Sequence, residues 1–278
     1  MSTKLPSYFS RDSRSAKISS GNTTTRLLGI FQRVDHVILV GCAGGVPHYS
    51  DFTKHPRRGD IIVSYPESSS EDENQNFVYA HFDAQKNQNS SQIVSKTWMP
   101  ASNELYKIVN NIRKIYNTNT PKRYKWEEYL EEGINSLYNE ELDCRRPSDT
   151  LDKLFFTVGE KSVIEVNHPE DTTNTTDRRQ FGYPTLRFGK VGGGEIVARD
   201  DNLRHSVSEQ FGIVCFDSGI DQVMESIEGN RKESFIIIRS IVDYIDGTTS
   251  KEWQPYAALC AASFMRTLIS ELPVSAHY

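Results

Sequence analysis

An aspartate at the end of an apolar run is the first side chain in this sequence that could do chemistry. The stretch 234–243 reads SFIIIRSIVD, and Asp243 is its last residue. An acid in this place can cap a following helix or exchange a proton with a substrate. Because the loop-like sequence YIDG begins at the next position rather than a helix, we favour proton transfer for Asp243.

A second acid, Asp217, ends the short apolar segment GIVCFD at 212–217. Ligands of open α/β sheets bind outside the C-terminal ends of the strands, so two acids at such ends indicate a binding site. Helix capping is an equal alternative for Asp217, because Ser218 and a helical pattern follow it.

Two glycine clusters accompany these acids. Residues 41–45, GCAGG, follow a β-branched apolar run, and their exposed N–H groups could bind an anion. This cluster matches neither the P-loop nor the dinucleotide fingerprint, so its local sequence alone predicts a tight turn. Residues 192–194, GGG, interrupt a β-like segment that we expect to resume beyond them. Glu195, directly after them, reads as a solvated loop acid.

The segments that must position these residues alternate between strand and helix patterns. Continuous apolar runs predict buried strands, and apolar residues three or four apart predict amphipathic helices. We expect strands at 37–40, 59–66, 152–158, 162–168, 184–200, 212–217 and 234–243, and helices at 103–117, 125–141, 218–230 and 256–272. This order predicts an α/β three-layer sandwich with a central mixed β-sheet flanked by helices. We expect one domain over 21–278, after a poorly ordered segment 1–20.

Composition excludes several classes of function. A net charge of −5 without a basic stripe argues against a nucleic-acid-binding protein. No apolar run approaches the ~20 residues that span a bilayer, and the N-terminus lacks the apolar core of a signal peptide. The histidines show no metal-ligand spacing, and the widely spaced cysteines suit reduced thiols: Cys42, Cys144, Cys215 and Cys260. We therefore expect a cytoplasmic protein with no metal, cofactor, membrane or nucleic-acid partner.

The order of the segments resembles the nucleoside phosphorylase superfamily, which includes purine and uridine phosphorylases and methylthioadenosine/S-adenosylhomocysteine nucleosidases. The segments are VGCAGGVP, RRGDIIVS, FGKVGGGEIVARD, GIVCFD, MES, IIIRSIVDYIDG and WQPYAALCAASF, spread over 21–272. The pattern RSIVDYID followed by WQPYAA is the most specific part. The resemblance looks closest to the eukaryotic branch in which such a domain is often fused to other modules.

This resemblance implies cleavage of an N-glycosidic bond in a purine nucleoside. Asp243 matches the family's general acid, which protonates N7 of the leaving base as the bond to the oxocarbenium-like ribose breaks. The family's base-side segment matches Gly194, Glu195 and Val197, and its ribose and nucleophile side matches Cys42, Ala43 and Gly44. Active sites near subunit interfaces imply a homo-oligomer, a dimer or an assembly of dimers.

The ribose-binding Met-Glu pair of the family has two alignments in this sequence. Counting back from Arg239 favours Met224 and Glu225, whereas aligning on GIVCFD puts Ser218 and a glycine there and leaves Asp217 or Asp221 to serve.

Other departures bear on the nucleophile and on the activity. Leu39 stands where phosphorylases carry an arginine, and Cys42 replaces a hydroxyl residue. Water is therefore favoured over phosphate as the nucleophile, with phosphate as the alternative co-substrate. Val197 replaces a base-stacking phenylalanine, and the family's first strands have no counterpart before residue 21. The alternative function is a catalytically impaired nucleoside-binding or scaffolding relative.

Overall fold

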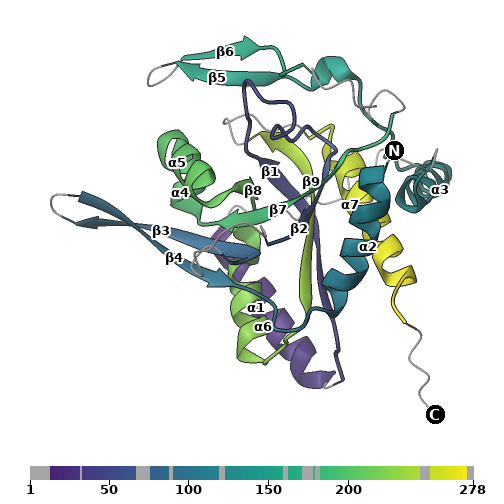
Figure 1. The fold of residues 1–278 in the computed structure, drawn as a ribbon, viewed down its shortest axis with the longest axis horizontal. Coiled ribbons are helices and arrows are strands. Elements are labelled where there is room, and N and C mark those ends of the chain that lie inside the picture. The colour runs from purple at the N-terminus through teal and green to yellow at the C-terminus, as the bar shows by residue number, and fades with distance from the viewer. Residues whose placement is uncertain are drawn as a thin grey trace, which may run out of the picture.

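The computed structural model describes most of the chain as one mixed α/β sheet flanked by helices (Figure 1). The described residues are 13–31, 33–66, 76–87, 90–118, 123–158, 162–170, 178, 182–244 and 251–273. In chain order the elements are α1 (Ser13–Ile30), β1 (Val37–Gly45), β2 (Ile61–Ser64), β3 (Tyr79–Asn87), β4 (Ser90–Trp98), α2 (Glu104–Thr118), α3 (Lys125–Asn139), the 3-10 helix η2 (Asp149–Leu151), β5 (Leu154–Val158), β6 (Ser162–Val166), β7 (Leu186–Gly193), α4 (Glu195–Arg199), α5 (Asp201–Phe211), β8 (Ile213–Phe216), the 3-10 helix η4 (Ser218–Ile220), α6 (Asp221–Gly229), β9 (Phe235–Tyr244) and α7 (Gln254–Ser270).

The main sheet has the strand order β2-β9-β1-β8-β7-β3-β4, and an additional β2–β7 pairing closes its first five strands on themselves. The pairs β1–β9, β7–β8, β2–β7 and β3–β7 are parallel, whereas β1–β8, β2–β9 and β3–β4 are antiparallel. The mixed sheet of the predicted α/β class is confirmed. Its closure through β2 and β7 was not predicted.

The centre of the sheet is formed by β1 and β9, which are the most apolar runs of the sequence. Residues 235–238 of β9 are buried, as the continuous apolar pattern predicts. Helix α7 packs directly on both strands. Its small residues Ala257 and Ala261 are fully buried at this contact layer and allow close approach. In Figure 1, α7 stands with α2 and α3 on one side of the sheet, and the β5–β6 hairpin lies apart from it.

Helix α1 begins within the segment 1–20 that we expect to be poorly ordered, and residues 13–20 are helical. Residues 1–12 lie outside the described part. The helix has no apolar stripe and instead lies against α6 through close contact and hydroxyl groups. A Cβ at Gly21 would come 2.8 Å from the Cβ of Gln222, and Thr25 Oγ1 donates to Ser226 Oγ at 3.0 Å. Because such contacts do not use apolar side chains, the spacing of apolar residues in the sequence does not predict this helix.

The segment after the second glycine cluster also differs from its prediction. We expected the strand of 184–200 to resume beyond the glycines, but β7 ends at Gly193 and α4 follows. Gly194 has φ 103°, a conformation that glycine adopts without strain, and a side chain there would collide with the Phe82 carbonyl oxygen. The β3–β4 hairpin and α5 were not predicted. The polar stretch 67–75 and most of 171–181 lie outside the described residues.

Candidate functional site

Asp243 and Asp217 flank the same short stretch of β1. Gly44 of β1 pairs with Asp243 of β9 on one side and with Phe216 of β8 on the other. Asp217 follows directly after β8. A register shift between Ala43 and Gly44 marks a β-bulge, which turns the strand at this point. The predicted residues Cys42, Ala43, Gly44, Asp217 and Asp243 are therefore brought together.

We call this group, with Arg239, the acidic junction. Arg239 Nε lies 2.8 Å from Asp217 Oδ2, and the arginine side chain is 3% exposed. Its Nη1 also donates to the Leu39 carbonyl oxygen at 2.8 Å. A Cβ at Gly41 would lie 3.5 Å from that nitrogen, so the glycine leaves room for the guanidinium over β1. Asp217 thus belongs to a buried ion pair.

Asp217 caps a helix and also forms an ion pair. Its Oδ1 accepts a hydrogen bond of 2.7 Å from the Gly219 backbone N–H, which caps η4. Its Oδ2 pairs with Arg239. Because the side chain is 19% exposed, it keeps some access to the space outside the strand ends.

Cys42 is half-buried next to these charges. Burial raises the pKa of its thiol to about 11; Arg239 opposes this, and Asp217 and Asp243 add to it. The thiol is therefore neutral near pH 7 and is not an activated nucleophile.

The strand end that carries Asp243 is anchored by the next residue. Tyr244 is fully buried, and its hydroxyl donates to Asp152 Oδ1 at 2.7 Å. Arg57 Nε donates to the other Asp152 oxygen at 2.8 Å. His55 stacks on the Tyr244 ring with centroids 5.5 Å apart. These contacts fix the backbone that positions Asp243, which is itself half-buried.

A second carboxylate group adjoins the junction. Tyr79 donates a short hydrogen bond to Asp221 Oδ1, and the Tyr79 hydroxyl lies 3.2 Å from the Asp217 carbonyl oxygen. His81 Nδ1 lies 3.0 Å from the same Asp221 oxygen. A side chain at Gly193 would collide with both the Tyr79 hydroxyl and Asp221. The glycine cluster therefore makes room for this group.

These contacts shift the pKa values of two of its members. The hydrogen-bonding contact with Asp221 is the main cause that raises the pKa of His81. Burial, followed by the charge of Asp221, raises the pKa of Tyr79 well above its ordinary value. Tyr79 is consequently a permanent donor in this group.

Several predicted site residues lie elsewhere. Glu225 is exposed and accepts from Lys96 Nζ at 2.8 Å, and Met224 is fully buried in the core. Val197 is fully buried in an apolar cluster with Phe77, Phe82 and Phe216. The Met-Glu alignment on Met224 and Glu225 is thus not supported by their positions.

The last two base-side predictions have structural roles. Gly194 makes the turn between β7 and α4, and Glu195 lies 3.4 Å from Lys17 of α1. This ion pair connects α1 with the start of α4.

Three members of the two groups were not predicted as site residues. Arg239 stands inside an apolar run, and a cation there signals a buried partner. Tyr79 and His81 belong to a hairpin whose sequence gives no such signal.

Among the described residues, no cluster of three or more His, Cys, Asp or Glu side chains could hold a metal ion. None of the described helices is both long and apolar enough to cross a bilayer.

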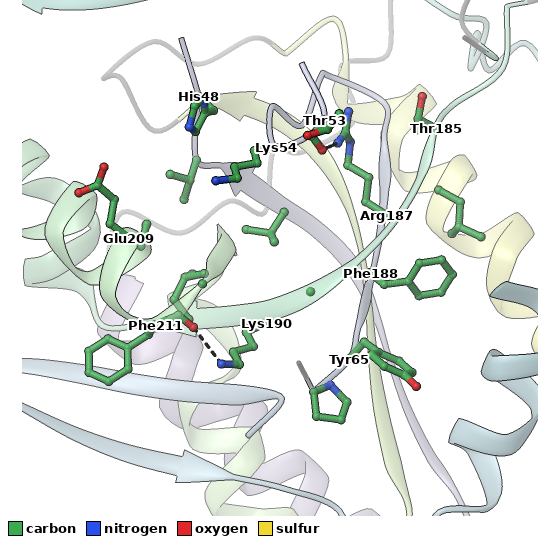
Figure 2. Close-up of a pocket in the computed structure, with 18 of the residues that line it drawn as sticks. His48, Thr53, Lys54, Tyr65, Thr185, Arg187, Phe188, Lys190, Glu209 and Phe211 are labelled. Carbon is green, nitrogen blue, oxygen red and sulfur yellow. Dashed lines mark hydrogen bonds between the residues drawn. The ribbon is translucent and has the colours of Figure 1, made fainter. Parts of the chain in front are cut away.

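A pocket of about 1060 Å³ begins at Val46, just beyond β1 (Figure 2). It follows the β7 segment from Leu186 to Lys190 and is bordered by the residues after β1, the C-terminal half of α2 and the α5–β8 connection. It contains none of the junction residues. We call it the basic pocket, for the charges described below.

Comparison with known proteins gives distant likenesses. No protein-family model matches the chain. It is 24% identical over 266 residues, 95% of its length, to a nucleotide-binding leucine-rich repeat (NLR)-like protein of Hyaloscypha variabilis, and spans only 24% of that relative.

Among solved structures, the chain is similar to futalosine hydrolase of Helicobacter pylori, with 13% identity, a TM-score of 0.45 and coverage of 92% of this chain and 76% of that one. It is also similar to a 5′-methylthioadenosine/S-adenosylhomocysteine nucleosidase of Neisseria meningitidis in complex with methylthio-immucillin-A, with 12% identity, a TM-score of 0.44 and coverage of 92% and 78%. Both are members of the nucleoside phosphorylase/nucleosidase superfamily that the sequence motifs resemble.

Proposed function

We propose that this chain cleaves the N-glycosidic bond of a purine nucleoside, with Asp243 as the general acid and water as the nucleophile. The observation that carries the proposal is the pairing of Gly44 with Asp243 on one side and Phe216, next to Asp217, on the other. A nucleoside at this strand end would meet one carboxyl group at its base and another at its ribose.

In this proposal Asp243 is the acid that protonates the leaving base. Cleavage builds negative charge on the base and positive charge on the ribose. A half-buried carboxyl group can keep its proton near neutral pH and deliver it to N7 of the purine. The anchored Tyr244 holds this strand end in one position, which keeps the acid aligned with the bond that breaks.

Asp217 is our candidate for the ribose side. It adjoins the Ala43–Gly44 backbone through the β8 register and is partly exposed. Its ionised form, held by Arg239, would accept hydrogen bonds from ribose hydroxyls and stabilise the positive charge that develops there. Asp221 is the alternative, and Glu225 is not, because it is engaged by Lys96 on the surface.

Charge favours water over phosphate at the junction. Arg239 is already paired with Asp217, and the neutral Cys42 thiol adds no positive charge. A phosphate dianion would therefore meet the ionised Asp217 without an unpaired cation of the junction to balance it, whereas water needs no such cation. Phosphorolysis remains the alternative reaction.

A nucleoside-binding or scaffolding role is the second candidate. It is favoured by the carboxylates' existing partners, since Asp217 is bound by Arg239 and Gly219, and Asp221 by Tyr79 and His81. The long NLR-like relative, of which the chain spans 24%, also suits a domain that acts within a larger protein. We keep the cytoplasmic location and the dimer-based assembly as predictions.

The test is base release from adenosine, inosine, guanosine and methylthioadenosine, with and without phosphate. We expect release without phosphate, and a loss of about 10²–10⁴-fold in Asp243→Asn, which keeps the shape of the side chain but cannot donate the acid proton. Glu225→Gln is the matched control and should leave turnover unchanged. Nucleoside binding measured by calorimetry, without turnover, would establish the second candidate. The absence of both binding and turnover would contradict both candidates.

A further inference from the structure

The basic pocket concentrates positive charge on an acidic chain. The chain has a net charge of −5, yet the described residues that line the pocket include one acid, Glu209, and four cationic side chains, Lys54, Arg113, Arg187 and Lys190. Asp60, behind the pocket wall, pairs with Arg187 at 2.8 Å. Among the described residues, counting Asp60 and Glu209 against two of the cations leaves an excess of positive charge in the pocket lining.

Arg113 of α2 is the cation whose surroundings point most clearly to a ligand. Its guanidinium group lies 4.8 Å from the Tyr65 ring centroid and 5.3 Å from that of Phe188. Within the described part of the chain, it has no carboxylate partner. Aromatic faces hold the guanidinium plane without consuming its N–H donors, so the fork stays available for a bidentate anion.

Lys54 supplies a second cation from the segment between β1 and β2. Its side chain is exposed and has no ion pair among the described residues. Figure 2 shows Lys54 and His48 on one side of β7, and Lys190 and Tyr65 on the other. Lys190 is 1% exposed and donates to the Phe211 carbonyl oxygen at 3.1 Å, so its ammonium group is engaged within the chain.

The size and the apolar lining set the class of ligand. A pocket of about 1060 Å³ is at the upper end of the range for small-molecule sites, far larger than an inorganic anion requires. Aromatic side chains contribute flat apolar surface beside the cations: Tyr65, Tyr116, Phe188 and Phe211. Such a combination suits a molecule with both a planar ring and phosphate groups.

We propose that the basic pocket is a second ligand site, distinct from the acidic junction, which binds a nucleoside phosphate with Arg113 on its phosphate groups and Lys54, across β7, adding to the positive charge of the pocket. The two sites have opposite charge requirements. The junction, whose cation Arg239 is already paired with Asp217, suits the uncharged nucleoside, whereas the pocket suits the anion. This proposal does not depend on catalysis at Asp243.

The test is calorimetric titration of the full chain with ADP, pyrophosphate and adenosine, using three variants. Arg113→Glu removes the guanidinium fork, and Lys54→Glu removes the exposed cation without disturbing buried contacts. Lys107→Glu makes the same charge change on the same helix α2, at an exposed position outside the pocket. Circular dichroism establishes that each variant is folded.

We expect ADP to bind more tightly than pyrophosphate and adenosine. Its affinity should fall about tenfold or more in Arg113→Glu and in Lys54→Glu, which corresponds to about 1.4 kcal/mol or more for each. Lys107→Glu should bind ADP like the unaltered chain. The proposal is overturned by absent ADP binding, by an unchanged affinity in both pocket variants, or by an equal loss in the Lys107 variant.

Discussion

The acidic junction and the basic pocket differ in whether their charged side chains have partners within the described part of the chain. At the junction the buried cation of Arg239 is matched by Asp217, and the adjoining Asp221 is matched by Tyr79 and His81. In the pocket, Arg113 lies on aromatic rings and Lys54 extends into solvent, with no carboxylate partner for either among the described residues. The charged groups described at the junction are paired with one another, whereas the cations Arg113 and Lys54 of the pocket have N–H donors available for an anion.

This difference predicts different costs when a charge is removed. Removing one partner of a buried ion pair leaves an uncompensated charge, which is strongly destabilising. Removing an unpaired cation from a pocket leaves nothing uncompensated behind. Stability measurements on variants of both regions therefore test whether the charges of the junction stabilise the fold and whether those of the pocket do not.

Arg239→Met should give the largest effect. It leaves Asp217 partly buried without its partner, and we expect the free energy of unfolding to fall by about 3–5 kcal/mol. Urea denaturation measures this change. The double variant Arg239→Met/Asp217→Asn should recover part of the loss, because it removes the orphaned charge. A loss below about 1 kcal/mol in the single variant would contradict the account of a tightly satisfied junction.

Tyr79→Phe should come next. Tyr79 is fully buried, and its hydroxyl donates to Asp221 while lying near the Asp217 carbonyl oxygen. Leaving these acceptors without that donor should cost about 1–3 kcal/mol in the free energy of unfolding. The same denaturation experiment measures it. An unchanged stability would mean that water replaces the hydroxyl and that the group is more open than its burial indicates.

Arg113→Met should have a smaller effect on stability than either junction variant. It removes the contacts with Tyr65 and Phe188, worth about 0.5–1 kcal/mol, but no ion pair. Thermal or urea unfolding in the absence of nucleotides provides the measurement. A loss of about 3 kcal/mol or more would show that Arg113 is a structural residue, and the contrast between the two regions would fail.

His81→Gln should give the smallest effect, and one that depends on pH. Because Asp221 raises the pKa of His81 in the folded state, protonated His81 stabilises the fold below its ordinary pKa of about 6.5. This contribution is lost as the pH rises through the raised folded-state pKa. The stability difference between the unaltered chain and the variant should therefore be present near pH 6 and vanish near pH 9. A difference that grows toward pH 9 would contradict this sign.

The sequence predicts the central strands well, because β1, β8 and β9 are apolar runs whose ends carry the acids. The acids Asp217 and Asp243, which the sequence singles out, lie on either side of Gly44 of β1, although β8 runs antiparallel to β1 and β9 runs parallel to it. Closure of the sheet by β2 and β7 depends on long-range pairing, which no local pattern encodes. Helix α1 was missed because it packs through Gly21 and hydroxyl groups rather than an apolar stripe.

The side-chain assignments show the same limit. Glu225 follows a buried methionine in the helical pattern of α6, so only the orientation of the helix decides that it faces Lys96 instead of the junction. Tyr79 and His81 reach Asp221 because Gly193 leaves space for them, and that space exists only after β3 and β7 pair. Pairing of distant segments, rather than local sequence, completes the candidate site.

A crystal structure of Asp243→Asn soaked with adenosine tests whether the nucleoside binds at the acidic junction with its base at residue 243, since the variant should bind the nucleoside without cleaving it. We expect the purine edge, with N7, within hydrogen-bond distance of residue 243 and the ribose beside Ala43, Gly44 and Asp217. Adenosine bound in the basic pocket, or at the junction with its base turned away from residue 243, would contradict it.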